Sequence, residues 1–150
     1  MRSPRLTPVV AAVTVFVLTV SMGAAHGSRF HPGRARGKMI HFVNHYRRHH
    51  GVGSLRMDRD IVRVAQRHSR RMAASRTLFH SSDMWTKLRG QHASCWGENV
   101  GMGPAAWRVF KGWVRSAGHR ANMLNRHYRR TGIGVVRAHG ALWITMIYYG

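Results

Sequence analysis

The chain has 150 residues and is strongly basic, with 25 Lys and Arg against 4 Asp and Glu and a formal net charge of +21 with the histidines neutral. Its single cysteine excludes an intramolecular disulfide, so a folded domain must be stabilised by its hydrophobic core. It contains no P-loop, GxGxxG, HExxH or paired CxxC motif, which disfavours nucleotide enzymes and zinc fingers.

Residues 1–25 have the pattern of an export signal peptide. Arg2 and Arg5 precede a mostly apolar run, and small residues at 23–25 offer a cleavage site. An uncleaved membrane anchor is the rival interpretation, but the run contains Thr and Ser and is shorter than the roughly 20 residues that a spanning helix needs. We therefore predict a secreted, extracellular protein with no transmembrane span after signal cleavage.

Residues 26–37 combine Gly, Pro and positive charge without apolar periodicity, which predicts a disordered basic leader. A single domain should follow over 38–150, because this length suits one core and is too short for two. Apolar residues recur at helical spacing from about Lys38 until Gly51, which predicts the first helix.

A second helix is predicted to follow Asp58, a suitable N-cap. Its apolar stripe consists of Ile61, Val64, Ala65, His68 and Met72. Residues 77–94 are rich in Ser, His and Gly and are predicted to form a long loop, and Val100 is placed in a short strand.

The last third of the chain changes from helical to strand periodicity. Pro104 is predicted to open a third helix that breaks at 116–118, and a short helical piece follows over 120–124. Apolar residues then alternate on either side of His139-Gly140, which predicts a hairpin. Helices followed by strands predict an α+β fold.

Glu98 is the only glutamate, and it lies in an apolar, glycine-framed segment, 95–101. A lone acid in such a segment indicates a specific partner, for which histidine is the first candidate. His80 and His119 are likewise framed by residues of structural type.

The order and framing of these motifs resemble the CAP domain family, also called the SCP or cysteine-rich secretory protein family, in its compact bacterial form. The resemblance runs from about Met39 to Tyr149. Its motifs are Val43-Asn44 with Arg47, Arg48, Gly51 and Leu55; Ala65 to Met72; Phe79-His80; Gly97-Glu98-Asn99; Trp113 to Leu124; and Gly132-Ile133-Gly134-Val135.

By this resemblance the fold would be a three-layer α-β-α sandwich with a C-terminal antiparallel hairpin and a cleft. The ligand-binding cleft would contain His80, Glu98, Asn99, Ser116 and His119. In members with two histidines and two acids, the second glutamate follows the tryptophan of the third helix by three positions. Ser116 stands at that position here, so a mechanism that needs both carboxylates is not reproduced.

Three roles are open for His80, Glu98 and His119. They could form a hydrogen-bonded cluster that organises the cleft, which is the interpretation we favour. The two histidines could instead hold a divalent metal such as zinc, although binding requires no cofactor. As catalytic residues they would belong to a metal-dependent hydrolase.

Three further features carry simpler interpretations. Asn99 beside glycine is expected to fix loop backbone, and Cys95 to be a buried small hydrophobe rather than a nucleophile. His41, His45 and His49 are spaced so that successive pairs share a helical face and could chelate a transition metal, but a solvated face is favoured.

The leading functional hypothesis is a secreted binding protein for a lipid, a cell-envelope polymer or a protein partner, using the cleft and a basic surface attracted to anionic ligands. The alternatives are the metal-dependent hydrolase and a cationic antimicrobial protein that binds anionic surfaces. Specific nucleic-acid recognition is disfavoured, because no aromatic residues are interleaved in a basic run.

Overall fold

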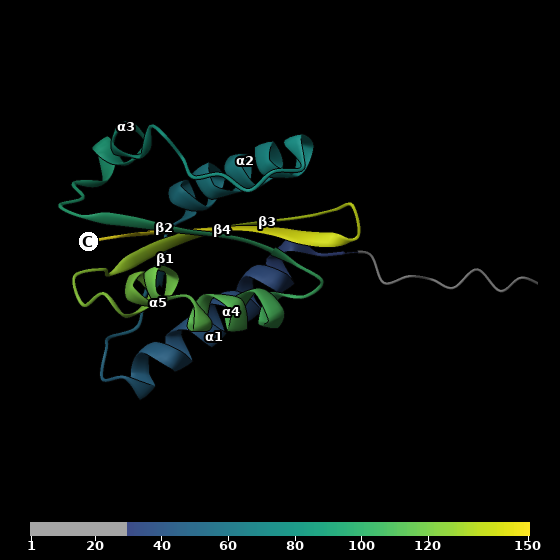
Figure 1. The fold of residues 1–150 in the computed structure, drawn as a ribbon. Helices are drawn as coiled ribbons and strands as arrows, with labels where there is room; N and C mark the ends of the chain where they lie inside the picture. Colours follow the sequence, from purple (N-terminus) through teal and green to yellow (C-terminus); the bar gives the residue numbers. More distant parts are fainter. Residues whose placement is uncertain (1–29) are drawn as a thin grey trace, which may run out of the picture.

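A four-stranded sheet forms the middle layer of the fold in the computed structural model, which describes residues 30–150 (Figure 1). The strand order is β1-β3-β4-β2; β1 runs parallel to β3, and the other neighbours are antiparallel. The strands are β1 (Arg56–Met57), β2 (Trp96–Gly103), β3 (Arg130–Ala138) and β4 (Ala141–Tyr149). The predicted signal peptide and residues 26–29 of the predicted leader lie outside the described residues.

Helices cover both faces of this sheet, which confirms the predicted α-β-α sandwich. Figure 1 shows α2 and α3 on one face and α1, α4 and α5 on the other. The helices are α1 (Pro32–His49), α2 (Arg59–Ser75), α3 (Met84–Leu88), α4 (Ala106–Arg115) and α5 (Ala117–Leu124), with a 3-10 turn η1 (Arg89–Gln91) after α3. No helix within residues 30–150 is both long enough and apolar enough to cross a membrane.

Helix α1 begins at Pro32, so the prediction of a disordered leader up to residue 37 is wrong for residues 32–37. Proline suits the first helical position, because the N–H it lacks would have no partner there. Ala35 is buried in the core, and Arg36 Nε donates to the carbonyl oxygen of Ile133 at 2.8 Å. These contacts attach the first turns of α1 to β3, which the glycine-rich and arginine-rich sequence did not reveal.

Helix α2 begins as predicted, with Asp58 as its N-cap. Asp58 Oδ1 accepts hydrogen bonds from the backbone N–H groups of Asp60 (2.8 Å) and Ile61 (3.1 Å). Asp58 Oδ2 accepts a third from the Tyr149 hydroxyl at 2.6 Å, which ties the start of α2 to the end of β4. Every member of the predicted apolar stripe is buried.

Helix α2 approaches β3 closely because two strand positions are glycine. A Cβ atom added at Gly132 would overlap the backbone of Ile61, and one added at Gly134 would overlap the backbone of Ala65. The Gly-Ile-Gly pattern therefore sets the distance between the sheet and its covering helix.

Three predictions for the middle of the chain differ from the structure. The segment 77–94 is not a continuous loop, because it contains α3 and η1; Met84 and Leu88, one helical turn apart, are buried against the sheet. Helix α4 begins at Ala106 rather than Pro104, since Ala105 is still extended (φ −152°, ψ 153°). The predicted break after α4 was 116–118, but only Ser116 separates the two helices, because Ala117 already belongs to α5.

The predicted hairpin is confirmed around His139-Gly140. Strands β3 and β4 pair as far as Ala138 and Ala141, which leaves two residues in the turn. His139 and Gly140 both have positive φ, 52° and 74°, as a two-residue type I′ turn requires.

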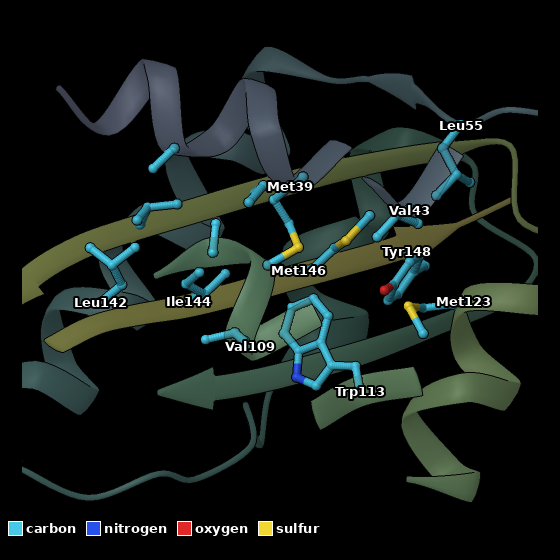
Figure 2. Close-up of a cluster of buried hydrophobic side chains, with 14 of the residues drawn as sticks. Met39, Val43, Leu55, Val109, Trp113, Met123, Leu142, Ile144, Met146 and Tyr148 are labelled. Atoms are coloured by element: carbon cyan, nitrogen blue, oxygen red, sulfur yellow. The ribbon is translucent and has the colours of Figure 1, made fainter. Parts of the chain in front are cut away.

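The main hydrophobic core lies between the sheet and the layer formed by α1, α4 and α5. Figure 2 shows Met39 and Val43 of α1 and Trp113 of α4 directed toward Met146 and Tyr148 of β4. All five side chains are buried. A second cluster packs α2 and α3 against the opposite face, so the sheet is covered on both sides.

Candidate functional site

Strand β2 is an edge strand that directs two neighbouring polar side chains to opposite faces of the sheet. Glu98 is paired with Ile147 of the α2 and α3 core, whereas Asn99 is paired with Met146 of the main core. The free edge of β2 is covered by side chains. Its carbonyl oxygens at Trp96, Glu98 and Val100 accept hydrogen bonds from Tyr128 Oη (2.8 Å), Asn122 Nδ2 (3.1 Å) and Trp113 Nε1 (3.0 Å).

Glu98 is buried, with 5% exposure, and both carboxylate oxygens are occupied. Oε1 accepts from His80 Nδ1 and from the backbone N–H of Ser81, each at 2.9 Å. Oε2 accepts from Ser81 Oγ at 2.9 Å. The carboxylate thus fixes the segment that leads from α2 to α3, while the His80 imidazole remains 63% exposed.

His119 lies on the other side of the strand, in the first turn of α5, and is not hydrogen-bonded to Glu98. Its Nδ1 is 2.8 Å from Ser116 Oγ, and its ring stacks on Trp113 at a centroid distance of 6.1 Å. Burial, and secondarily the positive charge of His80, lower the pKa of His119 below its usual value of 6.5. The two imidazoles therefore interact electrostatically around the edge of the sheet.

Asn99 is fully buried inside β2, so the expectation that it fixes loop backbone is wrong, because the residue belongs to a strand. Its Nδ2 donates to the carbonyl oxygen of His119 (3.0 Å) and to Tyr148 Oη (3.1 Å), and its Oδ1 accepts from Asn122 Nδ2 (2.9 Å). Asn99 and Asn122 thus hold α5 against the strand. Asn122 lies in the motif from Trp113 to Leu124, but its role could not be read from the motif.

The five predicted cleft residues are therefore brought together as two connected groups. Glu98 joins His80 on one face of the edge strand, and Ser116 joins His119 on the other, with Asn99 linking the strand to α5. Within residues 30–150, no three or more His, Cys, Asp or Glu side chains are grouped so as to hold a metal ion.

Two other candidates have surface or intermediate positions. His41, His45 and His49 are exposed along α1, with successive ring centroids 6.3 Å and 4.5 Å apart. Cys95 is half-buried rather than buried, since it lies just before β2, at the end of the sheet, with Sγ 3.7 Å from the carbonyl oxygen of Gly150.

A separate pocket of about 880 Å³ opens between the N-terminal parts of α1 and α4, beside the β3–β4 hairpin. Ala35, Phe42, Ala106 and Leu142 give it an apolar lining, to which Trp107, itself 41% exposed, contributes. Its charged lining residues are Arg34, Lys38 and Arg137. The sequence does not reveal this pocket, because its residues come from three distant segments, 30–42, 104–107 and the β3–β4 hairpin.

The fold and these motifs define a CAP-type domain. The chain matches the cysteine-rich secretory protein family, CAP, over residues 40–148 and belongs to it. In the solved structures, it is similar to an extracellular protein containing an SCP domain from Bacillus anthracis, with a TM-score of 0.70 and 25% identity, covering 79% of this chain and 41% of that one.

Two Bacillus subtilis proteins are similar in sequence. YkwD is 28% identical over 113 residues, or 71% of this chain and 44% of YkwD. The membrane protein YlbC is 32% identical over 110 residues, or 67% of this chain and 31% of YlbC. The chain thus spans less than half the length of either relative.

Proposed function

We propose that this chain is a secreted CAP-domain protein that binds an anionic amphiphile, such as a lipid or a lipid-bearing envelope component, in the pocket between α1 and α4. The observation that carries this proposal is the combination of an apolar lining with three cations, Arg34, Lys38 and Arg137, and no acidic residue in the same pocket. An acyl chain suits the lining, and an anionic headgroup suits the cations.

The pocket's surroundings add two further sources of attraction for an anion. Helix α4 has no side-chain cap and no acidic residue in its first turn, so the positive end of its dipole is uncompensated beside the pocket. The guanidinium of Arg108 and the ammonium of Lys111 lie over the Trp107 ring, 4.2 Å and 5.3 Å from its centroid. An exposed tryptophan among cations is suited to the interface of an anionic lipid assembly.

The state of Glu98 favours binding over hydrolysis. A carboxylate that accepts three hydrogen bonds from Ser81 and His80 has its basic oxygens occupied, whereas a general base must be free to accept a proton from its substrate. The His119 imidazole contacts a hydroxyl rather than an orienting carboxylate. The cleft residues are thus better suited to organising the edge strand than to turnover.

Secretion is part of the proposal and rests on two supports. The N-terminal segment has the charge and hydrophobicity pattern of an export signal. The similar Bacillus anthracis protein is described as extracellular. An exported basic protein would meet the anionic lipids and polymers of the cell envelope.

The test is calorimetric titration of the protein with lysophosphatidylglycerol below its micelle concentration, compared with zwitterionic lysophosphatidylcholine. We expect R34Q/K38Q/R137Q to bind the anionic lipid at least about tenfold more weakly, because each charged hydrogen bond contributes about 1.5–3 kcal/mol. The matched control is R59Q/R67Q/R70Q, which removes three exposed charges on α2. Equal losses in both triple variants would reduce the effect to net charge and contradict a specific pocket.

A divalent metal held by His80 and His119 is a second candidate, favoured because neither Nε2 atom has a hydrogen-bond partner among residues 30–150. Each ring has its Nδ1 engaged, by Glu98 or by Ser116, and an engaged Nδ1 orients a metal-ligating histidine. Two imidazoles alone would give weak binding. Zinc titration at near-neutral pH should show one site in the wild type and in H139Q, but none in H80Q or H119Q; no binding by the wild type removes this candidate.

A further inference from the structure

A basic pocket of about 310 Å³ lies where the parallel strands β1 and β3 begin, beyond the C-terminal end of α1. Its lining consists of one hydroxyl, that of Ser54, and three arginines, Arg56, Arg129 and Arg130. All four residues are exposed. Arg34 and Lys38 of the amphiphile pocket lie about 23 Å and about 17 Å along the helix axis from the C-terminal end of α1, and this pocket lies beyond that end.

Strand register places two of these arginines side by side. Arg56 and Arg130 are direct partners in the parallel β1–β3 pairing, so their side chains leave the same face of adjacent strands. Like charges directly opposite each other in a sheet destabilise it. An anion between the guanidinium groups would remove that repulsion.

The hydrogen-bond donors of this pocket are largely unused. Within residues 30–150, neither Arg56 nor Arg130 makes a side-chain hydrogen bond or an ion pair, and Arg129 donates only to the carbonyl oxygen of Arg126. Ser54 Oγ accepts from Arg48 Nη1 at 3.2 Å, so its own proton remains available to a ligand. The pocket can therefore offer guanidinium forks and a hydroxyl to one group of oxygens.

The charges around the pocket are also predominantly positive. Arg47 is fully buried nearby, and its guanidinium donates to four backbone carbonyls, those of Gly53, Met123, Asn125 and Tyr128, rather than to a carboxylate. Burial chiefly lowers the pKa of Arg47, and the charge of Arg129 lowers it further.

One acid close to the pocket in sequence is Asp58, which directly follows β1 and whose pKa is sensitive to the charge of Arg130. Burial alone would raise this pKa, but hydrogen bonds from Tyr149 and from the N–H groups of Ile61 and Asp60, with the Arg130 charge, lower it. Asp58 forms no ion pair with the pocket, because its oxygens already accept these bonds. The charge of Asp58 offsets part of the charge of Arg130, and the pocket with its three arginines keeps a net positive charge.

We propose that Ser54, Arg56, Arg129 and Arg130 form a binding site for a phosphoryl group, distinct from both the cleft and the amphiphile pocket. Guanidinium forks match the paired oxygens of phosphate, and several around one concave site provide bidentate recognition that a diffuse basic surface does not. The ligand is a phosphate ester, either a free monoester or the phosphodiester headgroup of a lipid. This inference is independent of the proposed amphiphile function.

The first test compares thermal unfolding in sodium phosphate with unfolding in sodium chloride of equal ionic strength. We expect phosphate to raise the Tm of the wild type through binding to the native state, and R56Q/R130Q to lose most of this rise. In chloride alone R56Q/R130Q should be at least as stable as the wild type, because the opposed charges are gone. The control R59Q/R67Q has the same net charge and should keep the wild-type response.

Calorimetric titration with inorganic phosphate supplies the affinity. Single R56Q and R130Q variants should each weaken binding about tenfold. R34Q/K38Q/R137Q should bind phosphate like the wild type, so failure of the amphiphile proposal and failure of this one are distinguishable. No phosphate-specific rise in Tm, or equal rises in R56Q/R130Q and R59Q/R67Q, would overturn the phosphoryl site.

Two probes distinguish a free phosphate monoester from a lipid headgroup as the ligand. Glycerol phosphate tests a free monoester, and phosphatidylglycerol vesicles, bound in the R34Q/K38Q/R137Q background, test a lipid headgroup. Loss of vesicle binding on adding R56Q/R130Q supports the lipid source. Loss of glycerol phosphate binding alone supports a soluble ester. Retention of both in the combined variant contradicts the site.

Discussion

Replacement of Glu98 by alanine should destabilise the fold because it leaves buried donors without an acceptor. The carboxylate accepts from the backbone N–H and the hydroxyl of Ser81, both buried, and from His80. Hydrogen bonds to charged groups contribute about 1.5–3 kcal/mol each, and at the lower end of this range the two Ser81 bonds account for about 3 kcal/mol. The His80 bond adds less than about 1 kcal/mol, because that imidazole is 63% exposed and the interaction is screened.

Urea unfolding of E98A, E98Q and H80Q tests how the stabilisation by Glu98 is divided between its Ser81 and His80 hydrogen bonds. E98A should lose about 3 kcal/mol of unfolding free energy, and H80Q less than about 1 kcal/mol. E98Q should lose about 1 kcal/mol, since its amide oxygen can still accept from Ser81 N and its amide nitrogen can donate to Ser81 Oγ. Amphiphile affinity should be unchanged in E98Q.

Two results would contradict the assignment of this stability to the Ser81 hydrogen bonds. An E98A variant within about 0.5 kcal/mol of the wild type would mean that the three hydrogen bonds do not stabilise the segment after α2. A loss in H80Q as large as that in E98A would mean that the His80 hydrogen bond, rather than the Ser81 contacts, carries the effect.

Three further predictions concern stability. Gly134→Ala should lower the free energy of unfolding in urea by about 3 kcal/mol, because its Cβ would overlap the Ala65 backbone. Gly112→Ala should raise it by up to about 1 kcal/mol, because this glycine lies inside a helix and an added Cβ has open space around it. A G134A variant as stable as the wild type would contradict the close packing of α2 on β3. Asp58→Ala should lower the free energy of unfolding by about 2 kcal/mol, because it removes the N-cap and the Tyr149 contact. Folding lowers the pKa of Asp58, so its carboxylate stabilises the protein above the pKa of the unfolded state, and the difference between D58A and the wild type should shrink as pH falls below about 4. A difference that does not change with pH would contradict this. Burial lowers the pKa of His119, so the unfolded chain binds a proton more readily than the folded one and the free energy of unfolding should fall as pH decreases below about 6.5. This fall should be less steep in H119Q than in the control H139Q. The same pH dependence in both variants would contradict the prediction.

The fold could be predicted wherever local chemistry and periodicity agree. Asp58 is a strong N-cap followed by a helical stripe, and His139-Gly140 separates two alternating runs, so both features were placed correctly. Pro104 misled because proline before a helix and proline at its first position look alike in sequence. The start of α1 could not be predicted, since Arg36 is ordered by a carbonyl on β3, 97 residues away.

The site could be predicted only as a set of residue types. The sequence indicates that Glu98 has a histidine partner, and His80 is that partner. It does not show that Ser81 supplies two of the three hydrogen bonds, because serine in a Ser-rich segment carries no distinguishing signal. Nor does it reveal either the amphiphile pocket or the arginine pocket, each of which exists only after the sheet brings separate segments together.

Chemical-shift mapping of the isotopically labelled protein with lysophosphatidylglycerol tests the binding function most directly. We expect saturable shifts at the amides of Ala35, Ala106 and Leu142, which line the pocket between α1 and α4, and little change at Ser81 and His119. Shifts confined to the cleft residues, or uniform small shifts over the basic surface, would contradict it.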